Sequence, residues 1–330
     1  MKTQTYFFSL FLALLFVTLS CNEDDGPGIP PPSEMTPPTS ADFLNLSSTA
    51  LDNLTQTFDF NIDGGTTYLE FISEQGVSVR IYTSCLTMGG QPLTGDVDVE
   101  FVELYKRGNL MTTNIATMGM HANGDLEMLV TGGAFYINVL QNGIEIDNVA
   151  CGIQMNVPTA LTGGVDHDMI MWYGNMDAEG NLVWEEAEEG DGGQGAGIEI
   201  TNDTYYTFLN QFGWANVDRF YNDPRPKTTI LVDVPEGYDQ NNSSVYLSYD
   251  GEDYGLARLD TWVNGMFSEH YGQIPIGLEV HVIFISEFEG SWVYAIKPVT
   301  IAGGEVITIS AEDLAAATED GIANHINTLP

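Results

Sequence analysis

Residues 175–186 place oxygen-bearing side chains at the spacing of a calcium-binding loop. Such side chains fall at loop positions 1, 3, 5 and 12, with glycine at position 6 and an apolar residue at position 8. Calcium is held by hard oxygen ligands, and glycine permits the sharp bend around the ion. A hairpin turn of the Asp-x-x-Gly-Asn type accounts for the same residues without a metal. We expect the turn and keep calcium as the alternative. The ligands would be Asn175, Asp177, Glu179, Asn181 and Glu186.

The three cysteines of the chain are Cys21, Cys85 and Cys151. If Cys21 is modified, an even pair remains, and an oxidising compartment would allow Cys85 and Cys151 to form one disulfide. Two separate buried thiols explain the same residues, because free cysteine is among the most buried residue types. The sequence leaves both possibilities open.

No other pattern in the sequence points to catalysis. The chain contains no Gly-x-Ser-x-Gly elbow, no His-Glu-x-x-His pair, no phosphate loop and no dinucleotide fingerprint. None of its five histidines has a neighbour at metal-ligand spacing. Its five tryptophans could form a sugar-binding surface if exposed, although tryptophan more often belongs to a core. We predict that the protein is not an enzyme, with a hydrolase acting on extracellular polymers as the alternative.

The charge of the chain restricts its partners. Nine basic residues face 47 acidic ones, which gives a formal net charge of −38. Such a surface repels nucleic acid and anionic lipid head groups, so both are excluded as partners. The acidic residues indicate a solvated shell suited to a saline environment, with weak attraction of divalent cations as a second interpretation.

The N-terminal end has the plan of a secretory signal peptide. Lys2 precedes an apolar stretch at 6–17, which is shorter than the ~20 apolar residues of a spanning helix. The segment Thr18-Leu19-Ser20-Cys21 then resembles the lipobox of bacterial lipoproteins, with Thr18 where leucine is usual. The resemblance implies cleavage after Ser20, so that residues 1–20 are removed and lipid is attached to Cys21. An ordinary cleaved signal peptide is the alternative.

An acidic cluster follows the cysteine directly. It consists of Asn22, Glu23, Asp24 and Asp25. The cluster resembles the export signal that sends Bacteroidota-type lipoproteins to the cell surface, although it is also explained as part of a very acidic chain. The resemblance implies an outer-membrane protein, anchored through its N-terminal lipid and facing outward. Six prolines between residues 26 and 40 favour extended conformations, so we expect 21–42 to be an acidic, Pro-rich tether.

The rest of the chain is predicted to be mainly β, as two β-sandwich domains in tandem. Between 43 and 187, short alternating runs are separated by Gly and Asn, which is typical of half-buried strands joined by turns. Glu-rich and Gly-rich residues at 188–198 predict a linker. We expect the second domain, 199–330, to open with a short helix at 202–209. A capping box at Ser310 predicts a closing helix of roughly 15 residues.

Short motifs in both predicted domains resemble modules of extracellular proteins. In the first domain these are 90–97, 131–135 and 153–159, which are similar to an uncharacterised β-domain of Bacteroidota surface proteins. In the second, 265–267 and 274–280 resemble the carboxypeptidase regulatory-like sandwich, and 212–220 is similar to a segment of the same surface proteins. The resemblance implies a non-catalytic binding, adhesion or accessory role. The partner would be an outer-membrane protein or an extracellular glycan or protein ligand; a structural subunit of an outer-membrane complex is the alternative.

Overall fold

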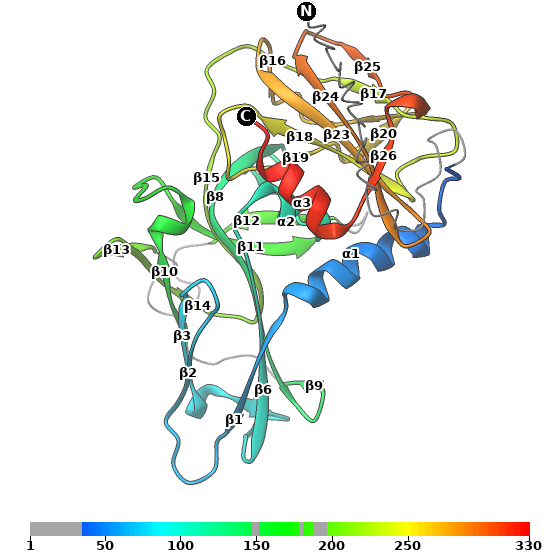
Figure 1. Cartoon of the computed structure of the whole chain (residues 1–330). Helices are drawn as coiled ribbons and strands as arrows, with labels where there is room; N and C mark the ends of the chain where they lie inside the picture. Colours follow the sequence, from blue (N-terminus) through cyan, green and yellow to red (C-terminus); the bar gives the residue numbers. More distant parts are fainter. Residues whose placement is uncertain (1–34, 147–151, 178–180, 188–196) are drawn as a thin grey trace, which may run out of the picture.

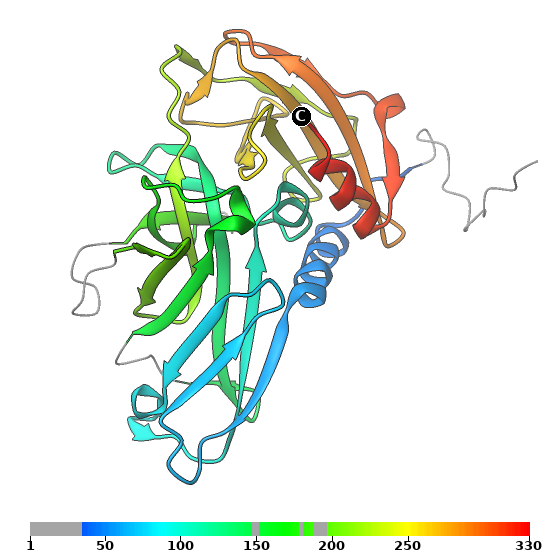
Figure 2. The ribbon, with the colours of Figure 1, turned by 60° about the vertical axis from the view of Figure 1, so that its left-hand side comes forward.

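The chain is built mainly from β-strands, as the alternating pattern predicts. The computed structural model describes residues 35–146, 152–177, 181–187 and 197–330 (Figure 1). Within these ranges no helix is long and apolar enough to cross a membrane. The strands form two layered assemblies, with α-helices lying where the two meet (Figures 1 and 2).

The first sandwich consists of two facing sheets. The large sheet has the strand order β1-β6-β8-β15-β11-β12-β7, with β9 beside β8, and the smaller sheet has the order β13-β14-β10-β3-β2. Inward side chains of both sheets, such as Phe101, Phe135 and Tyr205, are fully buried in one hydrophobic cluster. The large sheet contains β1 (Gln56–Asn61), β6 (Asp96–Leu104), β7 (Met118–Met120), β8 (Leu126–Gln141), β9 (Ile144–Glu145), β11 (Ile170–Met176), β12 (Leu182–Glu186) and β15 (Gly213–Phe220). The smaller sheet contains β2 (Tyr68–Ile72), β3 (Ser78–Tyr82), β10 (Ile153–Pro158), β13 (Glu199–Thr201) and β14 (Thr204–Leu209).

The first sandwich continues past 188–198, where the sequence predicts a boundary between two domains. Strand β14 pairs with β10, and β15 lies between β8 and β11, so strands on both sides of that segment belong to one sandwich. Glycine-rich composition indicates a connection but does not determine which sheet the next strand joins. The predicted boundary is corrected accordingly: the first sandwich extends to Phe220.

The prediction of a short helix at 202–209 is wrong, because these residues form the turn and the second strand of the hairpin β13–β14. Asn202 and Asp203 occupy its turn with positive φ angles of 52° and 58°. Asn and Asp tolerate this left-handed conformation and also cap helices, so the same residue types favour both structures. The alternation of Tyr205, Thr207 and Leu209 as buried residues identifies the strand.

The second sandwich begins near residue 227 and pairs two further sheets. Their orders are β20-β21-β17-β25 and β19-β18-β23-β24-β26, and the short pair β16–β22 lies beside them. The strands are β16 (Lys227–Thr228), β17 (Leu231–Asp233), β18 (Ser243–Tyr249), β19 (Ala257–Arg258), β20 (Thr261–Val263), β21 (Met266–Ser268), β22 (Ile274–Pro275), β23 (Glu279–Phe288), β24 (Ser291–Thr300), β25 (Val306–Thr308) and β26 (Ala315–Ala317). The two-stranded pair β4 (Thr87–Met88) and β5 (Gln91–Pro92) belongs to the first half of the chain.

Helix α1 (Ser40–Leu54) replaces the end of the expected tether and the start of the expected strand region. Thr39 and Asp42 form a capping box: the Asp42 N–H donates to Thr39 Oγ1, and the Asp42 carboxylate accepts from the Thr39 N–H. Phe43 and Ala50 lie on its buried face. The tether boundary near residue 42 is therefore corrected, because the helix starts within the predicted tether.

The closing helix is confirmed, but it is shorter than predicted. Ser310 and Asp313 form the expected capping box, which caps only the 3-10 turn η4 (Ala311–Asp313). Helix α3 (Glu319–Asn327) begins after β26, where the Gly321 N–H donates to the hydroxyl of Thr318. The remaining short helices are η2 (Thr83–Cys85), α2 (Arg107–Thr112) and η3 (Thr159–Thr162).

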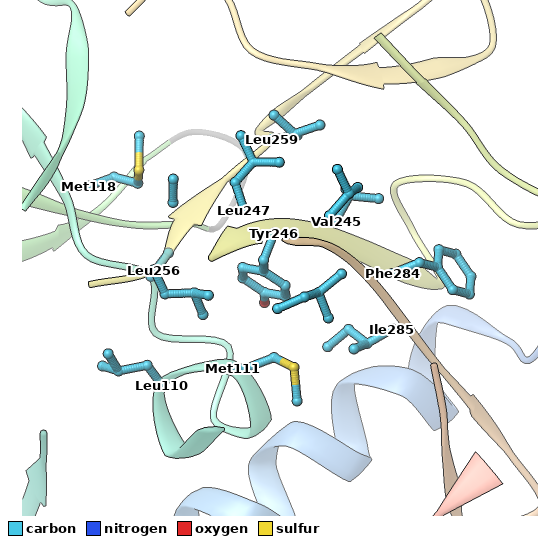
Figure 3. Packing of buried hydrophobic residues seen from close by; sticks show 14 of the residues in the cluster. Leu110, Met111, Met118, Val245, Tyr246, Leu247, Leu256, Leu259, Phe284 and Ile285 are labelled. Atoms are coloured by element: carbon cyan, nitrogen blue, oxygen red, sulfur yellow. The ribbon is translucent and has the colours of Figure 1, made fainter. Parts of the chain in front are cut away.

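The two sandwiches share a hydrophobic core. In Figure 3, Leu110 and Met111 of α2 lie in one group of buried side chains with Tyr246 of β18, and Ile285 lies on the side of Met111. Leu110, Met111, Tyr246 and Ile285 are all fully buried in the same cluster. The tandem arrangement therefore does not consist of two independent cores.

Helix α2 also makes polar contacts to the end of the chain. Arg107 is 1% exposed and donates to the carbonyl oxygens of Leu329 (2.7 Å) and Pro330 (3.1 Å). Gly108 lies so close to α3 that an added Cβ would collide with the backbone carbonyl of Ala323. A glycine at this position allows α2 and α3 to pack in contact.

Candidate functional site

Several predicted site residues lie outside the described residues. These are Cys21, the cluster Asn22, Glu23, Asp24 and Asp25, and also Cys151 and Glu179. Cys85 is described: it is 1% exposed in the core of the first sandwich and is disulfide-bonded. Its expected partner, Cys151, stays a prediction.

The residues proposed for calcium form a hairpin. Asn175 pairs with Val183 across β11 and β12, and Asp177 accepts from the Asn181 backbone N–H (2.7 Å) and side-chain amide (3.0 Å). Glu186 pairs with Trp172, four ladder positions from the turn, or roughly 13 Å along the strand at ~3.3 Å per residue. Within the described ranges no group of three or more His, Cys, Asp or Glu side chains is placed to hold a metal. The hairpin interpretation accounts for the described residues, and the described members of the predicted ligand set, Asn175, Asp177, Asn181 and Glu186, are not brought together.

The tryptophans belong mainly to the core. Trp172, Trp184 and Trp292 are at most 1% exposed, which excludes them as a sugar-binding surface. Trp214 and Trp262 are half-buried. The favoured interpretation of the tryptophans as core residues is therefore confirmed for three of the five.

A groove of 420 Å³ lies at one end of the first sandwich. In Figure 2, the turn between β2 and β3 approaches the end of α1. Residues of both segments line the groove. A volume of this size is typical of small-molecule sites. Its lining residues are Asn53, Leu54, Thr55, Gln56, Thr57, Phe58, Ile72, Ser73, Glu74, Gln75, Glu103, Tyr105 and Asn109.

The Glu103 carboxylate in this groove is 8% exposed and accepts four hydrogen bonds. Its Oε1 accepts from Gln56 Nε2 and from the Gln75 backbone N–H, both at 3.0 Å. Its Oε2 accepts from Ser73 Oγ and the Tyr105 hydroxyl, both at 2.9 Å. These donors occupy the roughly four acceptor positions of a carboxylate. Glu103 therefore fixes the shape of the groove and has no free position for acid-base chemistry.

The hydrogen bond from Tyr105 is maintained by its surroundings. Burial raises the pKa of the Tyr105 hydroxyl, and the Glu103 carboxylate raises this pKa further. The hydroxyl thus stays protonated and continues to donate at any physiological pH. The wall of the groove beneath it is preformed rather than assembled by a ligand.

The groups that remain available in the groove are mostly uncharged. Within the described structure, the Gln75 and Asn109 amides and the Thr57 hydroxyl make no side-chain hydrogen bond. Phe58 adds a ring that stacks on Phe71 with a centroid distance of 4.1 Å. Amide and hydroxyl groups beside an aromatic ring suit a compact ligand that offers hydroxyl or amide groups of its own.

Sequence reasoning missed this groove, although β6 carries a usable signal. Val97, Val99 and Phe101 alternate as inward residues, and Glu103 occupies the next inward position. A carboxylate at an inward position of a strand needs partners, because buried charges are seldom left unpaired. Tyr105 is two residues along the chain, but the other three partners come from segments 28 to 47 residues away and could not be identified from the sequence.

A second set of titratable groups lies in the second sandwich, and one of them, Asp260, lines a pocket of 280 Å³. Burial raises the pKa of Asp260 and raises the pKa of Glu269 to about 6. His270 Nδ1 lies 3.0 Å from Asp260 Oδ2, whereas Glu269 accepts the backbone N–H groups of Tyr271 and Gly272. Among the described residues that line this pocket, Asp260 is the one carboxylate. Glycoside hydrolysis uses two facing carboxyl groups, so the pocket lacks that arrangement in the described structure.

The most strongly perturbed carboxyl group is fully buried. Asp218 of β15 is 0% exposed, and burial raises its pKa well above the usual value. Asn216 Nδ2 donates to its Oδ2 at 2.5 Å, and Thr131 Oγ1 donates to Asn216 Oδ1 at 3.0 Å. This group joins the segments 131–135 and 212–220. Since no solvent reaches Asp218, its role is structural.

No family model matches the chain, and no curated protein matches it. The function is therefore inferred from the residues of the chain itself, and the groove around Glu103 is the described site best suited to a ligand.

Proposed function

We propose that this protein is a surface-displayed lipoprotein of the outer membrane with a non-catalytic binding role. The signal-like N-terminal segment, the lipobox-like residues before Cys21 and the acidic residues after it support the location. The preformed groove around Glu103 supports the binding role. The observation that carries the proposal is the saturation of the Glu103 carboxylate, which makes the groove a rigid recognition surface rather than a reactive one.

The ligand of the groove is a compact, uncharged molecule with hydroxyl or amide groups. Gln75 and Asn109 provide both donors and acceptors, and Phe58 provides an apolar ring. A ligand with a free carboxylate or phosphate meets no cationic side chain among the lining residues and is repelled by Glu74. A saccharide or a short neutral peptide fits these conditions.

The location is tested by lipid labelling. We expect wild-type protein to incorporate radiolabelled palmitate and the Cys21→Ser variant to incorporate none. Protease added to intact cells should then digest the wild-type protein, and replacement of Asn22, Glu23, Asp24 and Asp25 by alanine should protect it. Wild-type protein without label, or protease resistance on intact cells, would contradict the anchor or the outward display, respectively.

Ligand binding in the groove is tested by thermal-shift measurements with a panel of neutral mono- and disaccharides and dipeptides. We expect at least one member to raise Tm of the wild-type protein and to have no effect on the Gln75→Ala/Asn109→Ala double variant. Asn45→Ala is the matched control, because Asn45 is an exposed amide of α1 that does not line the groove. If no member shifts the wild-type protein at millimolar concentration, the groove does not serve this ligand class.

A further inference from the structure

The smaller sheet of the first sandwich presents aromatic side chains on its outward face. Tyr68 of β2 is opposite Tyr82 of β3, with ring centroids 6.4 Å apart. On β14, Tyr206 and Phe208 form a second pair, with centroids 5.0 Å apart. The buried residues of these strands alternate with them and face the core. Four aromatic rings therefore lie on the side of the sheet that is turned away from the large sheet.

The two aromatic pairs are joined across β10. Gln154 of β10 is opposite both Arg80 of β3 and Phe208 of β14, and its amide lies 3.4 Å from the Tyr82 hydroxyl. Phe208 also leans over Gly152, where an added Cβ would lie 3.2 Å from its ring. The absence of a side chain at Gly152 thus leaves room for the Phe208 ring beside β10. The rings of β2, β3 and β14 thus lie on the same face of the sheet, with Gln154 of β10 between the two pairs.

The charged groups on this surface nearly cancel. Arg80 lies over the Tyr68 ring, 4.6 Å from its centroid, and pairs with Glu70 at 2.5 Å. The edge strand β13 adds Glu199 opposite Tyr206. In a chain of net charge −38, this face carries one ion pair and one carboxylate among aromatic rings and amides. Its charge complements a neutral partner and offers no unpaired cation to a polyanion.

We propose that this aromatic face, defined by Tyr68, Tyr82, Tyr206 and Phe208, binds a neutral polysaccharide chain. The C–H groups of a sugar ring carry partial positive charge and lie against the negative face of an aromatic ring, while hydroxyl groups at the ring edge bond to amides such as that of Gln154. Within each pair the rings meet edge to face, at interplanar angles of 77° and 82°, so the surface offers both ring faces and ring edges to an extended polymer. This inference goes beyond the proposed function, because the aromatic face is separate from the groove around Glu103.

The test is a depletion assay with insoluble polysaccharides: microcrystalline cellulose, chitin, insoluble xylan and starch granules. We expect the full chain, purified in detergent, to be depleted by at least one of them. The Tyr68→Ala/Tyr82→Ala variant should bind that polymer about tenfold or more weakly, because two aromatic contacts are lost. Tyr68→Phe should retain binding, since the ring face remains.

Controls separate binding from folding and from the groove. Each variant is first shown to have wild-type circular dichroism and Tm, and Phe208→Ala provides an independent variant on another strand. Ile144→Ala removes a side chain that is 63% exposed on β9 and should leave binding unchanged. The Gln75→Ala/Asn109→Ala variant should also bind the polymer normally. Absence of binding to all four polymers, or binding that survives both aromatic variants, overturns the proposal.

Discussion

The buried Asp218 should make the protein less stable as pH rises, and the Asp218→Asn variant should remove that dependence. The carboxyl group has a raised pKa because burial disfavours its charged form. Between the unfolded pKa, near 3.9, and the raised folded pKa, the folded protein keeps a proton that the unfolded chain has released. The contribution of Asp218 is therefore fully present below the unfolded pKa and is lost as pH increases through this window.

The magnitude follows from proton linkage. One retained proton lowers the free energy of unfolding by about 1.4 kcal/mol for each pH unit in the window. Asparagine is uncharged and keeps an oxygen for the Asn216 amide, so the Asp218→Asn variant lacks this slope. The Asp218→Asn variant also loses stability by an amount that does not depend on pH. Asp218 Oδ1 has no hydrogen-bond partner in the described structure. The amide N–H that asparagine places there is therefore unsatisfied, which costs about 1–3 kcal/mol. The two stability curves should therefore differ in slope, whatever their offset.

The measurement is denaturant unfolding at pH 5, 5.5 and 6, followed by tryptophan fluorescence. Trp172 is a local reporter, because its indole N–H donates to the backbone carbonyl of Asp218 at 3.0 Å. Asp223→Asn is the matched control: Arg225 holds the pKa of Asp223 at about 2, so this carboxyl is ionised in both states above pH 5. Parallel curves for the wild-type protein and the Asp218→Asn variant would refute the reasoning and would mean that Asp218 is ionised in the folded protein.

Three further predictions concern stability. Glu269→Gln should remove a loss of stability between about pH 4.5 and 6, because the folded pKa of Glu269 is raised to about 6; pH-dependent thermal unfolding against the wild-type protein checks this. Gly108→Ala should lower Tm by several degrees, since α2 must move away from the Ala323 carbonyl, and an unchanged Tm would contradict the close packing. Cys85→Ser should cost about 2–5 kcal/mol under oxidising conditions, and the difference from the wild-type protein should disappear when reductant is present.

Alternation predicted the strands of the first sandwich well because both of its sheets have one buried face. In β3 and β10 every second residue is buried, which is the pattern that the sequence displays. Strand β18 shows no such alternation, because all seven of its residues, from Ser243 to Tyr249, are buried. One face contacts the second sandwich and the other contacts the shared core, so periodicity disappears there.

The sequence could not predict which segments share a sheet or a groove. The register that brings β14 to β10 and β15 to β8 depends on side chains more than 40 residues apart, and composition near 188–198 does not encode it. The groove depends in the same way on Glu103 and on the turn at Ser73, which are distant in sequence and meet through a hydrogen bond. A local feature such as the capping box of Thr39 and Asp42 can be recognised in the sequence, because it is made from residues three apart.

The position of α1 connects the proposed anchor with the proposed binding surfaces. Before the helix, the Pro38 carbonyl accepts from Asn242 of the second sandwich, and Pro37 lies against Gly237. The helix then spans about 22 Å at ~1.5 Å per residue and leads directly into β1 of the first sandwich (Figure 2). A chain anchored at Cys21 therefore reaches the second sandwich first. The groove and the aromatic face follow beyond the far end of α1, so both proposed binding surfaces lie on the half that is more distant from Pro37 and Pro38.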